Sequence, residues 1–232
     1  MRRLTPQDEF RGFPPEVFAW FAGLERDNSK AYFTATREQY ERDVRGGLEA
    51  LLDALSGEFG GAGGARVFRQ QRDLRFSRDK SPYKTRTYGV VPSASPAGFY
   101  AELSSQGLYA GAGYHQLAAD QLERYRAAVA AETTGAQLAE AVAAAGRAGL
   151  AVAGESLKTA PRGFPRDHPR AALLRHKALF AGGRLAGERG IGRGEALAHV
   201  ARTWRAAAPL TAWLDAHVGA SALPPDGRGR RP

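Results

Sequence analysis

Apolar residues recur at helical spacing over two stretches near the start of the chain. The first is a set of five apolar residues that begins at Val17 and ends at Leu24, and Pro14-Pro15 stand at its start, where proline is favoured. The second stretch follows a polar break at 27–29, and its apolar face runs from Tyr32 to Leu55. The pattern therefore predicts two helices, the longer one kinked at Gly46-Gly47.

The period changes to that of strands after residue 65. Four short stretches at 66–69, 87–91, 99–104 and 108–111 are rich in aromatic and β-branched residues. The last two are separated by Ser105-Gln106-Gly107, a length and composition that suit a hairpin. These features predict an antiparallel meander.

Helical spacing returns at Leu117 and continues over much of the remaining chain. It predicts two helices that meet near 133–135, a short helix from Pro169, and a helical segment at 196–218 that is interrupted near Pro209. A further short strand is expected at 177–180. The fold class expected is thus α+β, with a mainly antiparallel sheet, the central meander, covered by N-terminal, middle and C-terminal helices.

A chain of 232 residues with 43% hydrophobic content can bury one sizeable core. We expect a single domain over residues 1–223 and a disordered basic tail over 224–232. The expected parts of the domain are a helical layer at about 14–57, a strand-rich part at about 65–115, and helices with a second basic stretch at about 117–218.

Composition excludes several classes of site and location. The chain has no cysteine, so disulfides and thiolate zinc sites are excluded. No run of eighteen apolar residues occurs, which argues against a membrane span. Polar residues follow Met1-Arg2-Arg3 where a secretory signal would be apolar. We therefore expect a cytoplasmic protein without a membrane partner.

The formal charge of +9 is unevenly distributed. Residues 69–86, the first basic stretch, carry seven cations and two carboxylates. Residues 158–177, the second basic stretch, also contribute +5, which leaves the rest of residues 4–225 net acidic. Segregated charge favours a defined anion site over general coating of a polyanion.

Arginine and lysine side chains in these two stretches are the candidate ligand-binding residues. Guanidinium groups are planar forks that suit phosphate or carboxylate, and lysine adds a point charge. If both stretches converge on one pocket, they would bind a phosphorylated or otherwise anionic small molecule. The candidates are Arg72, Arg75, Arg78, Lys80, Lys84, Lys158, Arg162 and Lys177.

Four further residues are candidates for the same pocket: Asp73, Asp79, Tyr83 and His115. The two aspartates could instead be metal ligands or an acid–base pair, but the surrounding cations disfavour a divalent metal, and no metal site is predicted. The sequence assigns no catalytic residue, reaction, cofactor or oligomeric state. Whether the protein is an enzyme stays open.

Two alternatives belong to other classes of protein. In a nucleic-acid-binding module, the same cations would contact phosphates, and Tyr83 or His115 would stack on a base. In a structural or partner-binding protein, Asp73 and Asp79 would pair with nearby arginines and fix the loop to the body.

Several segments, in order along the chain, resemble the bacterial and fungal family known as domain of unknown function 2461. They are 12–15, Asn28 with Tyr32-Phe33, 72–85, 98–100, 111–115 and 157–177. The charged run 72–85 is the specific one. Gln70-Gln71 and Tyr32 depart from the residues usual in that family, but the charged positions do not. The resemblance implies a single α+β domain and assigns no activity.

Overall fold

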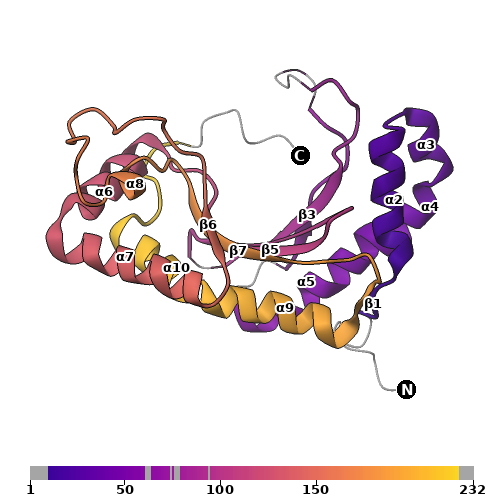
Figure 1. Ribbon diagram of the computed structural model, residues 1–232. Coiled ribbons are helices and arrows are strands. Elements are labelled where there is room, and N and C mark those ends of the chain that lie inside the picture. The colour runs from indigo at the N-terminus through magenta and orange to yellow at the C-terminus, as the bar shows by residue number, and fades with distance from the viewer. Residues whose placement is uncertain (1–9, 61–63, 74, 76–78, 94, 225–232) are drawn as a thin grey trace. The chain divides into compact units, whose positions relative to one another are not determined.

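The computed structural model describes residues 10–60, 64–73, 75, 79–93 and 95–224 (Figure 1). Contacts divide the chain into two compact units, each assembled from segments distant in sequence. Unit 1 comprises residues 1–94, 99–111 and 183–205. Unit 2 comprises residues 95–98, 112–182 and 206–232.

A six-stranded antiparallel sheet confirms the predicted α+β class and the central meander. Its order is β2-β3-β4-β5-β7-β6. The strands are β2 (Arg66–Val67), β3 (Arg86–Val91), β4 (Gly98–Ser104), β5 (Gly107–Tyr114), β6 (Ala151–Ala153) and β7 (Leu179–Leu185). In the β3–β4 pair, Tyr88 lies opposite Glu102 and Arg86 lies opposite Ser104. Opposed residues share a face of the sheet, so this register decides which side chains meet.

The predicted hairpin between β4 and β5 needs a glycine at its end. Gly107 has φ of 118°, a conformation that side chains rarely adopt. A Cβ atom there would lie 2.0 Å from the carbonyl oxygen of Leu185 on β7. Glycine therefore permits both the turn and the close approach of the two backbones.

Unit 1 contains most of the N-terminal helices and a small second sheet. Its helical elements are α2 (Pro15–Arg26), α3 (Lys30–Ala35), α4 (Arg37–Gln39), the π-helix η1 (Tyr40–Arg45), α5 (Gly46–Phe59) and α9 (Arg193–Ala206). Strands β1 (Gly12–Phe13) and β8 (Ile191–Gly192) pair antiparallel. The sequence pattern did not indicate this two-stranded sheet, because two residues are too few to show a period.

The long helix predicted after residue 29 is interrupted at Thr36. The Thr36 hydroxyl donates to the carbonyl of Tyr32 (2.9 Å) and accepts from the indole of Trp20 (2.9 Å). Hydrogen bonds of this kind compete with regular helix, which explains the break. The chain then passes through η1 into α5 at Gly46, where the kink was predicted.

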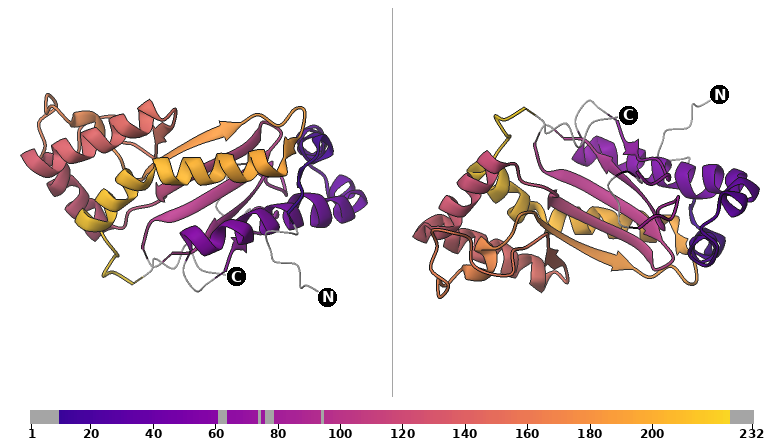
Figure 2. Two further views of the ribbon diagram at one scale, coloured as in Figure 1. Left: turned by 90° about the horizontal axis from the view of Figure 1, so that it is seen from below. Right: turned by 90° about the horizontal axis from the view of Figure 1, so that it is seen from above.

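Helices α5 and α9 cover one face of the sheet in unit 1 (Figure 2). Phe59 of α5 and Trp204 of α9 pack with ring centroids 5.1 Å apart, and both contact Phe99 of β4. The indole of Trp204 donates to the carbonyl of Tyr100 (3.2 Å). The opposite face presents the other set of alternating side chains, which includes Tyr88 and Glu102.

Unit 2 contains α6 (Ala119–Ala130), α7 (Glu132–Arg147), α8 (Ala171–Leu174) and α10 (Ala208–His217). The boundary between α6 and α7 falls at Ala131, so the 133–135 segment lies inside α7 rather than between helices. Gly135 serves packing: a Cβ atom there would lie 2.2 Å from the carbonyl oxygen of Val129. The sequence pattern misread this glycine as a helix end.

The segment between β6 and α8 is irregular, as its prolines predict. Helix α8 begins at Ala171 rather than at Pro169, and the ring of His168 accepts a hydrogen bond from the backbone amide of Arg170 (3.0 Å). Helices α9 and α10 are separated at Ala207, close to the predicted interruption near Pro209.

Candidate anion-binding site

Two paired arms of the first basic stretch form the base of a loop in unit 1. Gln71 and Tyr83 form an isolated antiparallel bridge. The Arg72 amide donates to the carbonyl of Pro82 (2.9 Å), and the Lys84 amide donates to that of Gln70 (3.0 Å). The base of the loop is therefore held by backbone hydrogen bonds, which fixes the positions of its charged residues.

Buried polar and aromatic residues anchor this base. The side-chain amide of Gln70, a residue that is 1% exposed, donates to the carbonyl of Lys84 and accepts from the hydroxyl of Thr87. Tyr83 stacks on Phe33 with centroids 4.2 Å apart, and the amide of Asn28 bonds both the amide and the carbonyl of Tyr83. Gln70, which departs from the family pattern, thus has a structural role here.

Each of the two loop carboxylates pairs with one arginine. Asp79 lies 2.9 Å from Arg72, and Asp73 lies 2.6 Å from Arg75. Hydrogen bonds from Arg75 lower the pKa of Asp73, and hydrogen bonds from Ser81 lower that of Asp79. These pairs agree with the structural alternative, in which the loop neutralises part of its own charge.

Four cations at the base of the loop form what we call the basic cluster: Arg69, Arg72, Lys84 and Arg86. Burial lowers the pKa of Lys84, and repulsion by the three arginines lowers it further. The Lys84 ammonium donates to the carbonyl of Arg69 (2.6 Å) and lies 4.9 Å from the ring centre of Tyr88. Among the described residues, the buried Nε of Arg72 has no hydrogen-bond partner. Like charges are thus held together at a fixed place.

Glu102 of β4 is the acidic residue beside this cluster on the exposed face of the sheet. Its side chain is 8% exposed and lies 3.5 Å from both Arg86 and Arg184. The hydroxyl of Tyr100 donates to it (2.5 Å), and Arg184 also donates to Ser104 (3.0 Å). Burial and the charge of Glu102 raise the pKa of Tyr100.

Sequence reasoning missed Glu102, Arg184 and Tyr100. For Tyr100 and Glu102 the signal was the alternation Tyr100, Glu102, Ser104 along a predicted strand, which places three polar or amphipathic side chains on one face. Arg184 carried no such signal, because only the pairing of β7 into the sheet brings it to this face.

The other predicted residues fall in different places. Arg78 lies outside the described residues. Lys80, Lys158 and Arg162 are exposed. In unit 2, Lys177 pairs with Glu155.

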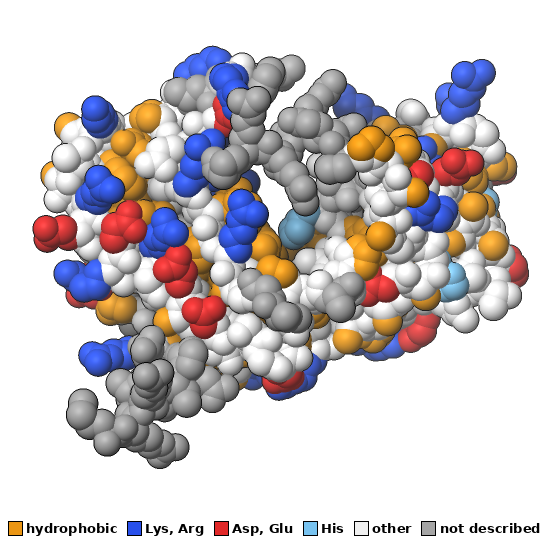
Figure 3. Space-filling view, turned by 180° about the vertical axis from the view of Figure 1, so that it is seen from behind, with side chains coloured by type: hydrophobic (Ala, Val, Ile, Leu, Met, Phe, Trp, Pro, Cys, Tyr) orange, Lys and Arg blue, Asp and Glu red, His pale blue; other side chains and the backbone are white. Residues whose placement is uncertain are grey.

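His115, also in unit 2, lies 4.9 Å from the ring of Phe180, and burial lowers its pKa. Tyr83 is 8% exposed, so its ring serves the core of unit 1. Lysine and arginine side chains are interspersed with carboxylates on the face shown in Figure 3.

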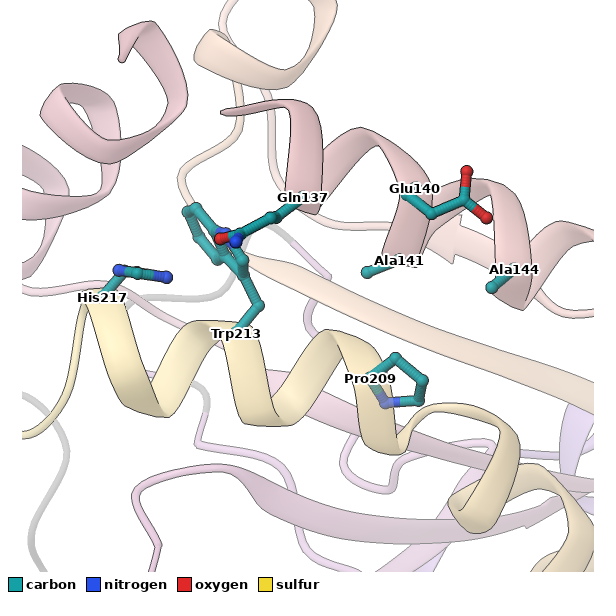
Figure 4. A pocket seen from close by; sticks show the side chains of 7 residues that line it. All are labelled: Gln137, Glu140, Ala141, Ala144, Pro209, Trp213 and His217. Atoms are coloured by element: carbon teal, nitrogen blue, oxygen red, sulfur yellow. The ribbon is translucent and has the colours of Figure 1, made fainter. Parts of the chain in front are cut away.

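A separate apolar groove lies within unit 2, between α7 and α10. Trp213 and His217 project from α10 toward Gln137 of α7 (Figure 4). The rings of Trp213 and His217 pack 5.0 Å apart, and the indole of Trp213 donates to the carbonyl of Thr134 (2.8 Å). Glu140 also lines this groove, and no lysine or arginine is among its lining residues.

Comparison with family models assigns the chain to a protein family. Residues 16–213 match the model described as conserved hypothetical protein (DUF2461). The chain belongs to the DUF2461 family. The match covers the whole of the sheet and the basic cluster, and it confirms the resemblance seen in the sequence.

Membership in DUF2461 assigns the chain to a family but identifies no reaction. No curated protein and no solved structure matches the chain. Within the part of the chain that the structure describes, no three potential metal-ligating side chains gather into a group, and none of the helices has the length and apolar character of a membrane span.

Proposed function

We propose that this DUF2461 protein binds a phosphorylated or other anionic ligand at the basic cluster of unit 1. The observation that carries the proposal is that the base of the loop holds four cations together. The Lys84 ammonium donates to the carbonyl of Arg69, and backbone hydrogen bonds fix Arg72 and Lys84 on the paired arms, so their like charges repel one another. Asp79 pairs with Arg72, and Glu102 lies near Arg86. These two carboxylates leave a surplus of positive charge in the cluster.

An anion bound there would relieve this repulsion. The side chain of Arg86 is 61% exposed and holds Glu102 only loosely, at 3.5 Å, so its guanidinium can donate to a ligand. The backbone and side-chain anchors at Gln70 and Tyr83 hold the cluster in place before the ligand arrives, which reduces the entropic cost of binding.

Thermal unfolding with inorganic pyrophosphate, at ionic strength matched with sodium chloride, tests the proposal. We expect pyrophosphate to raise the melting temperature, because a ligand that binds only the folded state stabilises it. Lys84→Met keeps the apolar stem over Tyr88 but removes the charge, and should weaken binding about tenfold or more. Equal melting temperatures in both salts would contradict the proposal.

Arg42→Ala is the matched control for loss of a charge. Arg42 lies on η1 in unit 1, is 70% exposed and pairs with its neighbour Asp43, so its removal should leave pyrophosphate binding unchanged.

Arg72→Ala distinguishes the structural alternative from the anion-binding proposal. If the first basic stretch serves stability alone, this change lowers the melting temperature and leaves the response to pyrophosphate intact.

The participation of the second basic stretch in this site stays a prediction. Lys158, Arg162 and Lys177 were expected to complete the same site, and we retain them as candidate residues for the same ligand. The proposal is for binding and names no reaction.

A further inference from the structure

Four aromatic side chains form a continuous row across the exposed face of the sheet in unit 1. We call Phe68, Tyr88, Tyr100 and Tyr109 the aromatic row. Ring centroids are 4.9 Å apart for Phe68 and Tyr88, 5.6 Å for Tyr88 and Tyr100, and 6.2 Å for Tyr100 and Tyr109. All four residues are half-buried, so part of each remains accessible. The row runs across the strands rather than along one of them.

Cations accompany the row along its length. Arg66 lies over the ring of Phe68 (5.0 Å), Lys84 over Tyr88 (4.9 Å) and Arg184 over Tyr109 (5.3 Å). Arg86, on the same face, contacts Glu102, which also contacts Arg184. Positive charge therefore extends beyond the basic cluster, as far as β7.

The length of this surface favours an extended ligand. From β2 to β7 the row and its cations cross four inter-strand spacings of about 4.8 Å, or about 19 Å in all. A single phosphate group would contact only one end. A nucleic-acid strand with stacked bases places a phosphate about every 3.4 Å, so about five or six nucleotides would span the row.

We propose that the anionic ligand is a single strand of nucleic acid that lies across β2, β3, β4, β5 and β7 on this face. The inference rests on the proposed function, because the basic cluster would contact one part of the strand. Cations beside aromatic rings match phosphates beside bases, and such combinations are typical of surfaces that bind single strands. Inorganic polyphosphate offers nothing to the rings, and a duplex keeps its bases stacked inside.

The contacts within the row define how the strand would lie. Phe68 and Tyr88 are nearly parallel, with 26° between their planes, and already stack on each other. Bases would therefore contact the outer side of the row without insertion between its rings. A tyrosine hydroxyl can donate or accept a hydrogen bond, so Tyr88 and Tyr109 would contribute hydrogen bonds to sugars or bases.

Fluorescence anisotropy with labelled oligo(dT) and oligo(U) tests the inference. We expect affinity to rise with length up to about six nucleotides and to fall with salt, with a slope of about −0.7 in log–log form for each phosphate contact. Unlabelled single strands should compete better than duplex or polyphosphate of equal phosphate number. Arg184→Gln should weaken six-nucleotide strands while two-nucleotide strands and pyrophosphate bind as before.

Tyr88→Leu and Tyr109→Leu test the rings. Each should weaken binding of a twelve-nucleotide strand about fivefold or more. Tyr109→Leu should also leave pyrophosphate binding intact, because the Tyr109 ring lies under Arg184, outside the basic cluster. Arg42→Ala should change neither. Pyrophosphate binding together with oligonucleotides that bind no tighter than polyphosphate would overturn this inference alone. Failure of both pyrophosphate and oligonucleotides to bind would overturn the proposed function as well.

Discussion

At the scale of single residues, Glu102 controls the charge of the exposed sheet face. It is a carboxylate with 8% side-chain exposure, and Arg86 and Arg184 approach it from two different strands. A buried charge is tolerated only when it is paired and hydrogen-bonded, and Tyr100 supplies the further hydrogen bond. Glu102 thus orients two guanidinium groups and also competes with any anionic ligand for them.

We predict that Glu102→Gln lowers stability and strengthens anion binding. The change leaves Arg86 and Arg184 without their shared carboxylate, so the free energy of unfolding should fall by about 1–3 kcal/mol. Pyrophosphate should recover part of this loss, because at the basic cluster it restores negative charge beside Arg86. Chemical denaturation with and without pyrophosphate measures both effects, and equal recovery in wild type and variant would contradict the prediction.

The same substitution should lower the pKa of Tyr100. Burial raises this pKa above the ordinary value of about 10, and the Glu102 charge raises it further, so a neutral glutamine removes the second contribution. A raised tyrosine pKa costs stability above about pH 10, where the unfolded chain ionises more readily. Ultraviolet absorbance titration of wild type, Glu102→Gln and the reference variant Tyr100→Phe isolates the Tyr100 transition.

At the scale of elements, short segments are held by side chains that come from elsewhere in their unit. Asn28 stands between α2 and α3, yet it accepts from the amide of Tyr83 (3.0 Å) and donates to its carbonyl (3.1 Å). Asn28 thus forms with the backbone of the first basic stretch the two hydrogen bonds that a neighbouring strand would otherwise form. Because Tyr83 also stacks on Phe33, the loop base and the helices of unit 1 form one packed element.

Asn28→Ala should therefore destabilise the loop base and weaken anion binding together. The Tyr83 amide loses its hydrogen-bond partner and the Tyr83 carbonyl keeps the weaker bond from Arg72 (3.3 Å), at a cost of about 1–3 kcal/mol. Hydrogen exchange at the Tyr83 amide should accelerate, while exchange in α9 should change only as far as global stability falls. Asn28→Asp retains the acceptor for the Tyr83 amide and should protect that amide better than alanine does.

In unit 2, Asp120 ties the chain after α10 to α6. Its carboxylate accepts from the Ser221 hydroxyl (2.7 Å) and the Ala222 amide (2.9 Å), and Arg124 lies 3.1 Å away. The Ser221 hydrogen bond is the largest of the contributions that lower the pKa of Asp120 to about 2.

The lowered pKa predicts an acid-sensitive contact at Asp120. The unfolded carboxyl has a pKa of about 3.9, so its stabilisation is complete above that pH and is lost as pH falls toward about 2. Asp120→Asn should be less stable than wild type at pH 7, and the difference should vanish near pH 2. A constant difference between pH 7 and pH 2 would assign the effect to packing instead.

At the scale of the whole molecule, positive charge is concentrated in two stretches of a chain whose net charge is +9. The first stretch lies in unit 1 and the second in unit 2. Concentrated charge accelerates association with an anionic ligand and makes its binding depend on salt. Both stretches contribute to the long-range field, whichever residues contact the ligand directly.

A double-mutant cycle tests whether the two stretches bind one ligand. If Lys84 and Lys158 contact the same anion, Lys84→Met and Lys158→Met should show a coupling of about 0.5 kcal/mol or more in pyrophosphate affinity. Additive effects would limit direct contact to one of the two stretches. A parallel cycle that combines Lys84→Met with Arg42→Ala gives the reference for an exposed charge outside the basic cluster.

The sequence alone determined the α+β class, the central meander, most helices and the first basic stretch, because these follow from local periodicity and charge. It did not determine that Gly135 lies inside a helix, since close packing and a helix end both favour glycine. Only the tertiary structure decided that Arg184 and Glu102 meet, because strand order and register bring together residues 82 positions apart. The first basic stretch was visible as charge, and long-range pairing placed it beside the aromatic row.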